Sequence, residues 1–313
     1  MIRYVIKRIL FMIPVLLAIT VIIFSIMYIT PGDVTTTILG ADATQADREA
    51  LREDLGFNRP YVVRLADYVV QVFVHGNFGD SYVTGKAVVT SLAERMPRTI
   101  AIGFISLFLQ IIIGIPLGIY AATHQGKLGD HLTMLIAMIG VSIPQFWLAL
   151  MLIILFSVRL HWLPAYGIDS WKSYVLPCVA NSFAGLVGMA RQTRASILEV
   201  IRQDYITTAR AKGVSKRAVI FGHALPNGLL PMITMCGGNL GTLFGGSVVI
   251  ETVFSIPGIG QYMTNGINNR DLPIIMGCVI MLGAIFSVVM LIVDLIYAFV
   301  DPRIKAQYSK GGK

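Results

Sequence analysis

Long uncharged stretches recur along the chain, and the shorter segments between them hold the lysines, arginines and acids. A helix that crosses a bilayer needs about 20 consecutive apolar residues. The pattern therefore predicts an all-α polytopic membrane protein with six transmembrane helices. The fifth stretch is too long for one straight span, so its helix is expected to begin near Pro226–Leu230. The six stretches are Ile9–Thr30, Thr99–Thr123, Thr133–Val158, Ser173–Ala190, Ala218–Ile250 and Leu272–Val293.

Charge gives the topology, because cytoplasmic loops of membrane proteins carry an excess of Lys and Arg. An even number of spans places both termini on one side. That side, with residues 124–132 and 191–217, is rich in basic residues, whereas the other side has more acids than bases. We therefore expect both termini in the cytoplasm. Ile9–Thr30 is longer than the apolar region of a signal peptide and is expected to be a retained first span.

Composition agrees with a membrane protein. Of the 313 residues, 55% are hydrophobic and 13% are charged, whereas a soluble domain carries about 25% charged residues. The net charge of +8 is explained by topology and does not indicate a nucleic-acid partner. The three cysteines lack metal-ligand spacing, so we expect small buried side chains and no metal site. They are Cys178, Cys236 and Cys278.

The only sizeable water-facing segment is the extracytoplasmic loop at residues 31–98. Within it, Asp47–Leu55 is typical of a short surface helix, and Thr44 can cap its N-terminus. This loop can cover the mouth of a pathway or contact a soluble partner. Its expected turns lie at Gly56, Pro60, Gly76 and Gly79.

Glycines at four-residue spacing mark one face of the fifth span, at Gly237, Gly241 and Gly245, and of the second, at Gly114 and Gly118. Glycine lets helix backbones approach closely in lipid, where packing drives association. Two interpretations follow. The stripes pack helices within one subunit, or they form an interface with a second, similar subunit around a pathway.

Catalytic and nucleotide-binding signatures are absent from the sequence. There is no phosphate-binding loop, and no HExxH or GxSxG motif occurs. The predicted spans hold few ionisable residues, whereas ion-coupled carriers need such residues in mid-membrane. Asp294, near the inner end of the last span, suits an ion pair or a helix end better than a coupling-ion site. We therefore expect no catalytic residues, and a driving force supplied from outside this chain.

Asp204–Pro226 is basic, helix-forming and interrupted by one glycine. Ser196 and Glu199 have capping-box spacing for a helix start. Gly213 is placed to end that helix in a left-handed conformation, and Ser215 to cap a second helix that runs towards His223. The segment either docks a soluble partner or lies on anionic lipid. A partly apolar stripe on the first helix comprises Ile197, Leu198, Ile201, Tyr205, Thr208 and Ala209.

This segment resembles the cytoplasmic coupling motif of ABC importer permeases, which runs Glu-Ala-Ala, three residues, Gly, nine residues, Ile-x-Leu-Pro. The Glu-Ala-Ala positions of this motif are occupied by Thr207-Thr208-Ala209, and the glycine position is occupied by Gly213. The motif ends here with His223-Ala224-Leu225-Pro226. Thr207, Thr208 and His223 depart from the general pattern, and the departures resemble the peptide/nickel branch of the family. Four further landmarks agree in order: Pro31-Gly32-Asp33, Gly76-Asn77-Phe78-Gly79, Gly246–Gly260 and Val293–Arg303.

The resemblance implies a type I ABC importer permease fold. It divides the chain into residues 1–30 with the first span, the loop at 31–98, a permease core at 99–300 with coupling helices at about 196–223, and a cytoplasmic tail at 301–313. It also implies two ATP-binding subunits, a second homologous permease, an extracytoplasmic substrate-binding protein and surrounding lipid. ATP and Mg²⁺ belong to the partner subunits. The residues implied to contact the ATPase are Asp204, Tyr205, Thr207, Thr208, Ala209, Arg210, Lys212, Gly213, Leu225 and Pro226.

The function implied is di- or oligopeptide uptake across the bacterial inner membrane. Nickel, a nickel chelate, glutathione or another small peptide-like solute are the alternatives, and an ion-coupled carrier is a distant one. No substrate-binding residue is assigned, because each polar residue of the spans can line a pathway or join two helices by a hydrogen bond. These residues are Gln110, Ser142, Gln145, Asn181, Ser182 and Asn239.

Overall fold

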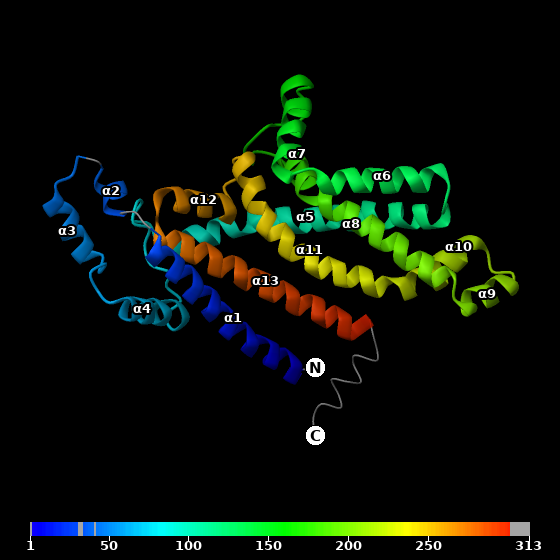
Figure 1. Ribbon diagram of the computed structural model, residues 1–313, viewed down its shortest axis with the longest axis horizontal. Helices are drawn as coiled ribbons and strands as arrows, with labels where there is room; N and C mark the ends of the chain where they lie inside the picture. The colour runs from blue at the N-terminus through cyan, green and yellow to red at the C-terminus, as the bar shows by residue number, and fades with distance from the viewer. Residues whose placement is uncertain (1, 31–33, 41, 301–313) are drawn as a thin grey trace. The chain divides into compact units, whose positions relative to one another are not determined.

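The computed structural model describes residues 2–30, 34–40 and 42–300. Regular structure in these ranges is helical apart from one isolated bridge, Asp80–Ala87, which confirms the all-α prediction. The helices are α1 Ile2–Ile29, α2 Val34–Leu39, α3 Gln45–Asp54, α4 Tyr61–Phe73, α5 Val88–Thr123, α6 Leu128–Ser142, α7 Gln145–Leu152, η1 Ile153–Arg159, η2 Trp171–Tyr174, α8 Val175–Ile201, α9 Asp204–Ala211, α10 Lys216–Ala218, η3 Val219–Ala224, α11 Leu225–Val253, α12 Ile259–Asn269 and α13 Leu272–Val300 (Figure 1).

Five helical segments are long and apolar enough to cross a membrane, and a bent pair of helices makes a sixth crossing if it is counted as one span. The prediction of six spans is confirmed in that sense. The five segments are Val5–Ile29, Val88–Thr123, Trp171–Ile201, Lys216–Val253 and Leu272–Ile296.

The third predicted span, Thr133–Val158, is not a straight helix. Leu128–Ser142 and Gln145–Arg159 meet at an angle of 104°. Proline has no N–H to continue the hydrogen-bond ladder, and it disfavours helical backbone at the residue before it. Ile143, which precedes Pro144, is accordingly extended at φ −81° and ψ 122°. Figure 1 shows α7 leaving the direction of α6 at this point.

The chain forms two compact units, which we describe separately. The larger unit is built on Ile100–Ile256 and the described residues from Val289 onward. In it α8 packs against α6, α7 and α11 (Figure 1). The glycine stripe of α5 serves this packing, since a Cβ at Gly114 would stand 2.8 Å from the Leu186 carbonyl oxygen and one at Gly118 would stand 2.5 Å from that of Ala190.

The glycine stripe of α11 divides into two parts. A Cβ at Gly237 would stand 2.9 Å from Val293 Cγ1, so this glycine packs helices within the chain. Gly241 is half-buried, whereas Gly245 is exposed and a Cβ there would meet nothing within 4 Å. Packing inside one subunit is confirmed at Gly237, and the surface at Gly245 stays available to a partner.

The smaller unit comprises Ile2–Thr99 and Pro257–Val288. The predicted Thr44 cap is confirmed: its hydroxyl accepts the Asp47 N–H, and Asp47 reciprocates in a capping box. α4 was not predicted. α5 begins at Val88, well before the predicted Thr99, because the helix continues past its uncharged part into a segment whose Val88 and Leu92 side chains are fully buried.

The tip of the long loop is fixed by a buried carboxylate. Asp271 accepts hydrogen bonds from the Ser81 hydroxyl at 2.6 Å and the Val83 N–H at 3.2 Å. It also accepts the Ile274 N–H at 3.4 Å, at the start of α13. Burial raises the pKa of the neighbouring Tyr82 hydroxyl to about 12. The loop segment at Ser81–Val83 is therefore held to the start of α13.

Candidate functional site

The coupling pair, defined here as residues 204–224, consists of α9, a glycine turn, α10 and η3. Gly213 follows α9 with φ +82°, as predicted. Its N–H bonds the Arg210 carbonyl at 3.0 Å, and the Val214 N–H bonds the Ala209 carbonyl at 3.2 Å. These two bonds form a Schellman motif, which satisfies the last carbonyls of the helix and reverses the chain. The Ser215 cap is also confirmed, because its side chain accepts the Ala218 N–H.

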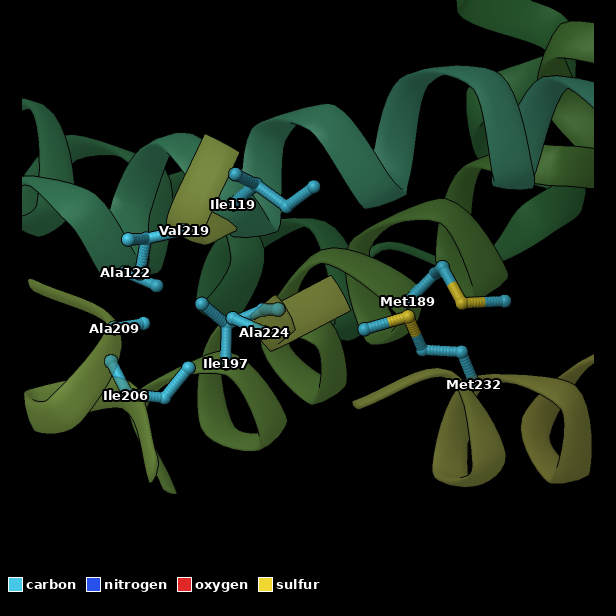
Figure 2. Packing of buried hydrophobic residues seen from close by; sticks show 9 residues of the cluster. All are labelled: Ile119, Ala122, Met189, Ile197, Ile206, Ala209, Val219, Ala224 and Met232. Carbon is cyan, nitrogen blue, oxygen red and sulfur yellow. The ribbon is translucent and has the colours of Figure 1, made fainter. Parts of the chain in front are cut away.

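An apolar cluster fixes the coupling pair to the ends of three long helices (Figure 2). Ile206 of α9 and Val219 and Ala224 of η3 are at most 1% exposed. Burying a side chain such as that of Ile206 or Val219 contributes about 1.5–3 kcal/mol. The pair therefore has a fixed position relative to the transmembrane helices. Its partners in the cluster are Ile119 and Ala122 of α5, Met189 and Ile197 of α8, and Met232 of α11.

The opposite face of the coupling pair is exposed, and most of the predicted contact residues lie there. Ala209 is the exception: it is 8% exposed and packs in the apolar cluster, because it lies one turn after Ile206 on the same side of α9. Leu225 is half-buried against that cluster. The exposed residues of the predicted set are Asp204, Tyr205, Thr207, Thr208, Arg210, Lys212, Gly213 and Pro226.

The predicted start of the pair at Ser196 is wrong. α8 continues to Ile201, and Ser196 lies in its interior with 5% exposure. The chain breaks at Arg202–Gln203, and Gln203 precedes α9 without a side-chain cap. The apolar stripe that we predicted for one helix is thus divided between α8 and α9. A capping-box spacing inside a long helix does not by itself mark a helix start.

A buried ion pair joins α8 to the first turn of α6, and it was not predicted from the sequence. Arg194 donates to both carboxylate oxygens of Asp130, at 2.5 and 2.7 Å. The Asp130 side chain is 3% exposed and that of Arg194 25%. Asp130 also accepts the Gly126 N–H at 3.0 Å. The fork-shaped contact holds α6 in register with the C-terminal half of α8.

Four of the six polar span residues meet in the larger unit and form the amide cluster, together with Ser106. Gln145 donates to the Asn181 Oδ1 at 2.6 Å, and the Asn181 amide donates to the Ser106 Oγ at 3.2 Å. Asn239 donates to the Gln110 Oε1 at 2.8 Å. These bonds connect α5, α7, α8 and α11.

A cavity of about 130 Å³ opens beside the amide cluster and is lined by Gln110, Gln145 and Asn181. No described lining residue is charged. Ser142 and Ser182 do not join the cluster, because each hydroxyl bonds a carbonyl of its own helix. The arrangement offers amide donors and acceptors inside the membrane without a fixed charge.

Long apolar helices, one bent helix pair, an uncharged cavity and an exposed helix pair are the features expected of a membrane transport subunit. Comparison with known proteins identifies its family. Residues 114–306 match the family described as binding-protein-dependent transport system inner membrane component, and residues 1–103 match its N-terminal counterpart. The chain belongs to this family.

Relatives of full length support the same assignment. The chain is 38% identical to the dipeptide transport system permease protein DppB of Alkalihalophilus pseudofirmus, over 97% of this chain and 100% of that protein. It is 39% identical to the glutathione transport system permease protein GsiC of Escherichia coli, over 97% of this chain and 99% of that protein.

Solved structures confirm the fold. A chain of the MetNI methionine ABC transporter in an inward-facing conformation superposes with a TM-score of 0.57 at 22% identity, over 67% of this chain and 96% of that chain. The family match and the full-length relatives together identify the protein as the multi-pass permease subunit of an ABC importer in the inner membrane. Membership of the family implies ATP-binding subunits and a substrate-binding protein as partners. The chain is a transport subunit and not an enzyme.

Proposed function

We propose that this chain carries short peptides across the membrane, di- and oligopeptides first. The observation that carries the proposal is the likeness along nearly the whole chain to permeases named for a dipeptide and for glutathione, both of which are short peptides. The amide cluster supports it chemically. Side-chain amides are donors and acceptors that match peptide groups, and no described charge in the cavity selects for ions.

We propose further that the exposed face of the coupling pair docks an ATP-binding subunit. The second permease of the complex docks the other ATP-binding subunit in the same way. The apolar cluster that holds the coupling pair supports this role, because a rigid attachment can transmit displacement to α5, α8 and α11. Arg210 and Lys212 supply polar contacts at the rim, and Gly213 allows close approach. ATP and Mg²⁺ are bound by those subunits.

A second, related permease completes the pathway in this proposal. The exposed stretch of α11 at Gly245 suits a helix–helix contact with it, since glycine permits close backbone approach in lipid. The positive-inside pattern supports cytoplasmic termini, so that the coupling pair faces ATP. The extracytoplasmic binding protein then delivers the solute to the opposite side.

Glutathione is the second candidate substrate, favoured by the identity of 39% to GsiC. Nickel or a nickel chelate is a third, from the resemblance of the coupling segment to the peptide/nickel branch. Uptake of labelled dipeptide, tripeptide, glutathione and nickel should be compared in cells with and without this chain. We expect loss of dipeptide and tripeptide uptake. Loss of nickel uptake alone would keep the architecture and replace the substrate.

A further inference from the structure

The helix α4 has two apolar faces, although it lies in the segment between the first two spans that was expected to face water. One face packs against protein, where α4 lies beside α1 (Figure 1). Val72 is 7% exposed and joins an apolar cluster with Phe24 of α1 and Met276 of α13. The hydroxyls of Tyr61 and Ser25 also share a hydrogen bond of 2.7 Å. This face therefore fixes α4 to two membrane spans.

The second apolar face of α4 is exposed. Residues at four-residue steps lie on one side of a helix, and on this side they are Val62, Ala66, Val70 and Val74. Val62 and Val74 are each 71% exposed, and Val70 is 48% exposed. An interface with a soluble protein carries about one hydrogen bond per 100–200 Å². The aliphatic side chains of this face have no group that can make one, so the face suits hydrocarbon better.

Polar side chains occupy the third side of α4, at three- and four-residue steps: Arg64, Asp67 and Gln71. Asp67 pairs with Arg59 at 2.7 Å, and their side chains are 55% and 56% exposed. The Arg64 guanidinium lies 4.7 Å from the centroid of the Phe57 ring. Arg59 and Phe57 belong to the segment that joins α4 to α3, whose residues are all at least partly exposed. The polar side therefore faces water, and the exposed valines point elsewhere.

Contacts with the spans give the depth of α4 in the membrane. Tyr61 and Tyr68, two turns apart, have ring centroids 5.8 and 6.0 Å from that of Phe24, so α4 crosses α1 at this level. The α1 span ends at Ile29, which places the crossing about 7 Å inside that end at a rise of 1.5 Å per residue. Met276 lies about 6 Å inside the start of the α13 span by the same measure. An interfacial helix buries its apolar face about 5–10 Å deep.

We propose that α4 is an interfacial helix and that its exposed valine face lies among the lipid acyl chains at this end of α1. The three sides of the helix then face the three environments of such a position, which are protein, water and hydrocarbon. The valine face continues the lipid-facing surface of α1, whose apolar part is only 11% buried within the chain. The segment between the first two spans is thus attached to the membrane surface at α4.

The test uses the complete purified importer in nanodiscs, with a nitroxide spin label on the cysteine of Val70→Cys. Collisions with oxygen, which concentrates in hydrocarbon, and with water-soluble chromium oxalate report the surroundings of the label. Ile26→Cys is the lipid reference, because Ile26 is 53% exposed on the α1 span. Asp67→Cys, on the polar side of α4, is the water reference. The importer without an introduced cysteine gives the background.

We expect the Val70→Cys label to show the high oxygen-to-chromium collision ratio of Ile26→Cys, at a depth of about 5–10 Å. A ratio as low as that of Asp67→Cys would place the valine face in water and overturn the proposal. Protection from both reagents would mean that a protein covers the face, which would also overturn it. Val62→Cys, two turns earlier on the same face, should give the same high ratio and replaces Val70→Cys if that variant does not assemble.

Discussion

The coupling pair and the amide cluster are two regions of the same unit that are built in opposite ways. The coupling pair is one continuous segment of the chain. One of its faces is buried in the apolar cluster, and the opposite face is polar and exposed. The amide cluster comes from four helices, and its polar groups face inward and bond one another. A partner-facing surface can thus be encoded locally, whereas a polar intramembrane site exists only after the helices pack.

α8 belongs to both regions. Asn181 lies near its beginning and takes part in the amide cluster, whereas Ile197 lies near its end and packs against the coupling pair. The Asp130–Arg194 ion pair fixes α6 to the same helix between them. α8 therefore packs both against the coupling pair and against the bent α6–α7 segment that carries Gln145. Substitutions that break this connection at different points separate the two regions.

The largest effect is expected at the ion pair. Asp130→Ala leaves the Arg194 guanidinium without its carboxylate, which costs about 3 kcal/mol of stability, the lower end for a buried pair, because Arg194 is 25% exposed. The midpoint of thermal unfolding of the purified complex measures this. The charge exchange Asp130→Arg with Arg194→Asp should recover part of the loss. Arg191→Gln is the control, because Arg191 is exposed on the same helix. If Asp130→Ala and Arg191→Gln unfold alike, the ion pair does not fix α6.

Two neighbouring residues of α9 distinguish the buried face of the coupling pair, which stabilises it, from the exposed face, which is proposed to bind a partner. Ile206→Ala removes a fully buried side chain and should cost about 3 kcal/mol. Tyr205 is 44% exposed, so Tyr205→Ala should change stability by less than about 0.5 kcal/mol but weaken association with the ATP-binding subunits. Unfolding midpoints and co-purification of those subunits give the two readouts. Loss of stability in Tyr205→Ala with intact association would reverse the assigned roles.

The sequence allowed prediction of features that depend on a few neighbouring residues. The Thr44 cap, the Ser215 cap and the left-handed Gly213 each depend on a local backbone demand that one residue type meets. The number of spans followed from the length of the uncharged stretches. Helix starts inside long helices were less predictable. α5 begins at Val88, but charged residues lie between Val88 and its apolar part, so its start was predicted too late. The spacing of Ser196 and Glu199 resembled a capping box although both residues lie inside α8.

Contacts between distant segments could not be predicted. Asp130 and Arg194 are 64 residues apart, and both appeared as ordinary cytoplasmic charges. Ser106 was overlooked because a serine in an apolar span bonds its own helix as readily as another. Which of the six polar span residues meet depends on helix rotation, and the bend at Pro144 sets the direction of Gln145. Helix packing determines which side chains contact one another, and this packing cannot be inferred from a single sequence.

The amide cluster should respond to a single truncation. Asn181→Ala leaves the Gln145 amide without its acceptor, at a cost of about 1–3 kcal/mol, whereas the Ser106 hydroxyl still donates to the Cys178 carbonyl at 3.3 Å. We expect slower peptide uptake at equal membrane abundance, while the ATP-binding subunits still co-purify. Ser142→Ala is the control, because its hydroxyl bonds only the Met138 carbonyl and is exposed. Equal uptake by both variants would remove the cluster from the pathway.

A modest change in stability and the sharpest change in coupling are expected at Gly213. A Cβ there would meet nothing within 4 Å, so its cost comes from the left-handed backbone alone, about 1–2 kcal/mol for an ordinary residue. Gly213→Val should still insert, but ATP hydrolysis should continue with little peptide uptake in proteoliposomes. Gly213→Asn should be intermediate, since asparagine tolerates this conformation. Gly222→Ala is the control, because Gly222 has no positive φ and the same open space. Normal uptake per ATP in Gly213→Val would show that the turn orders the pair without transmitting its movement.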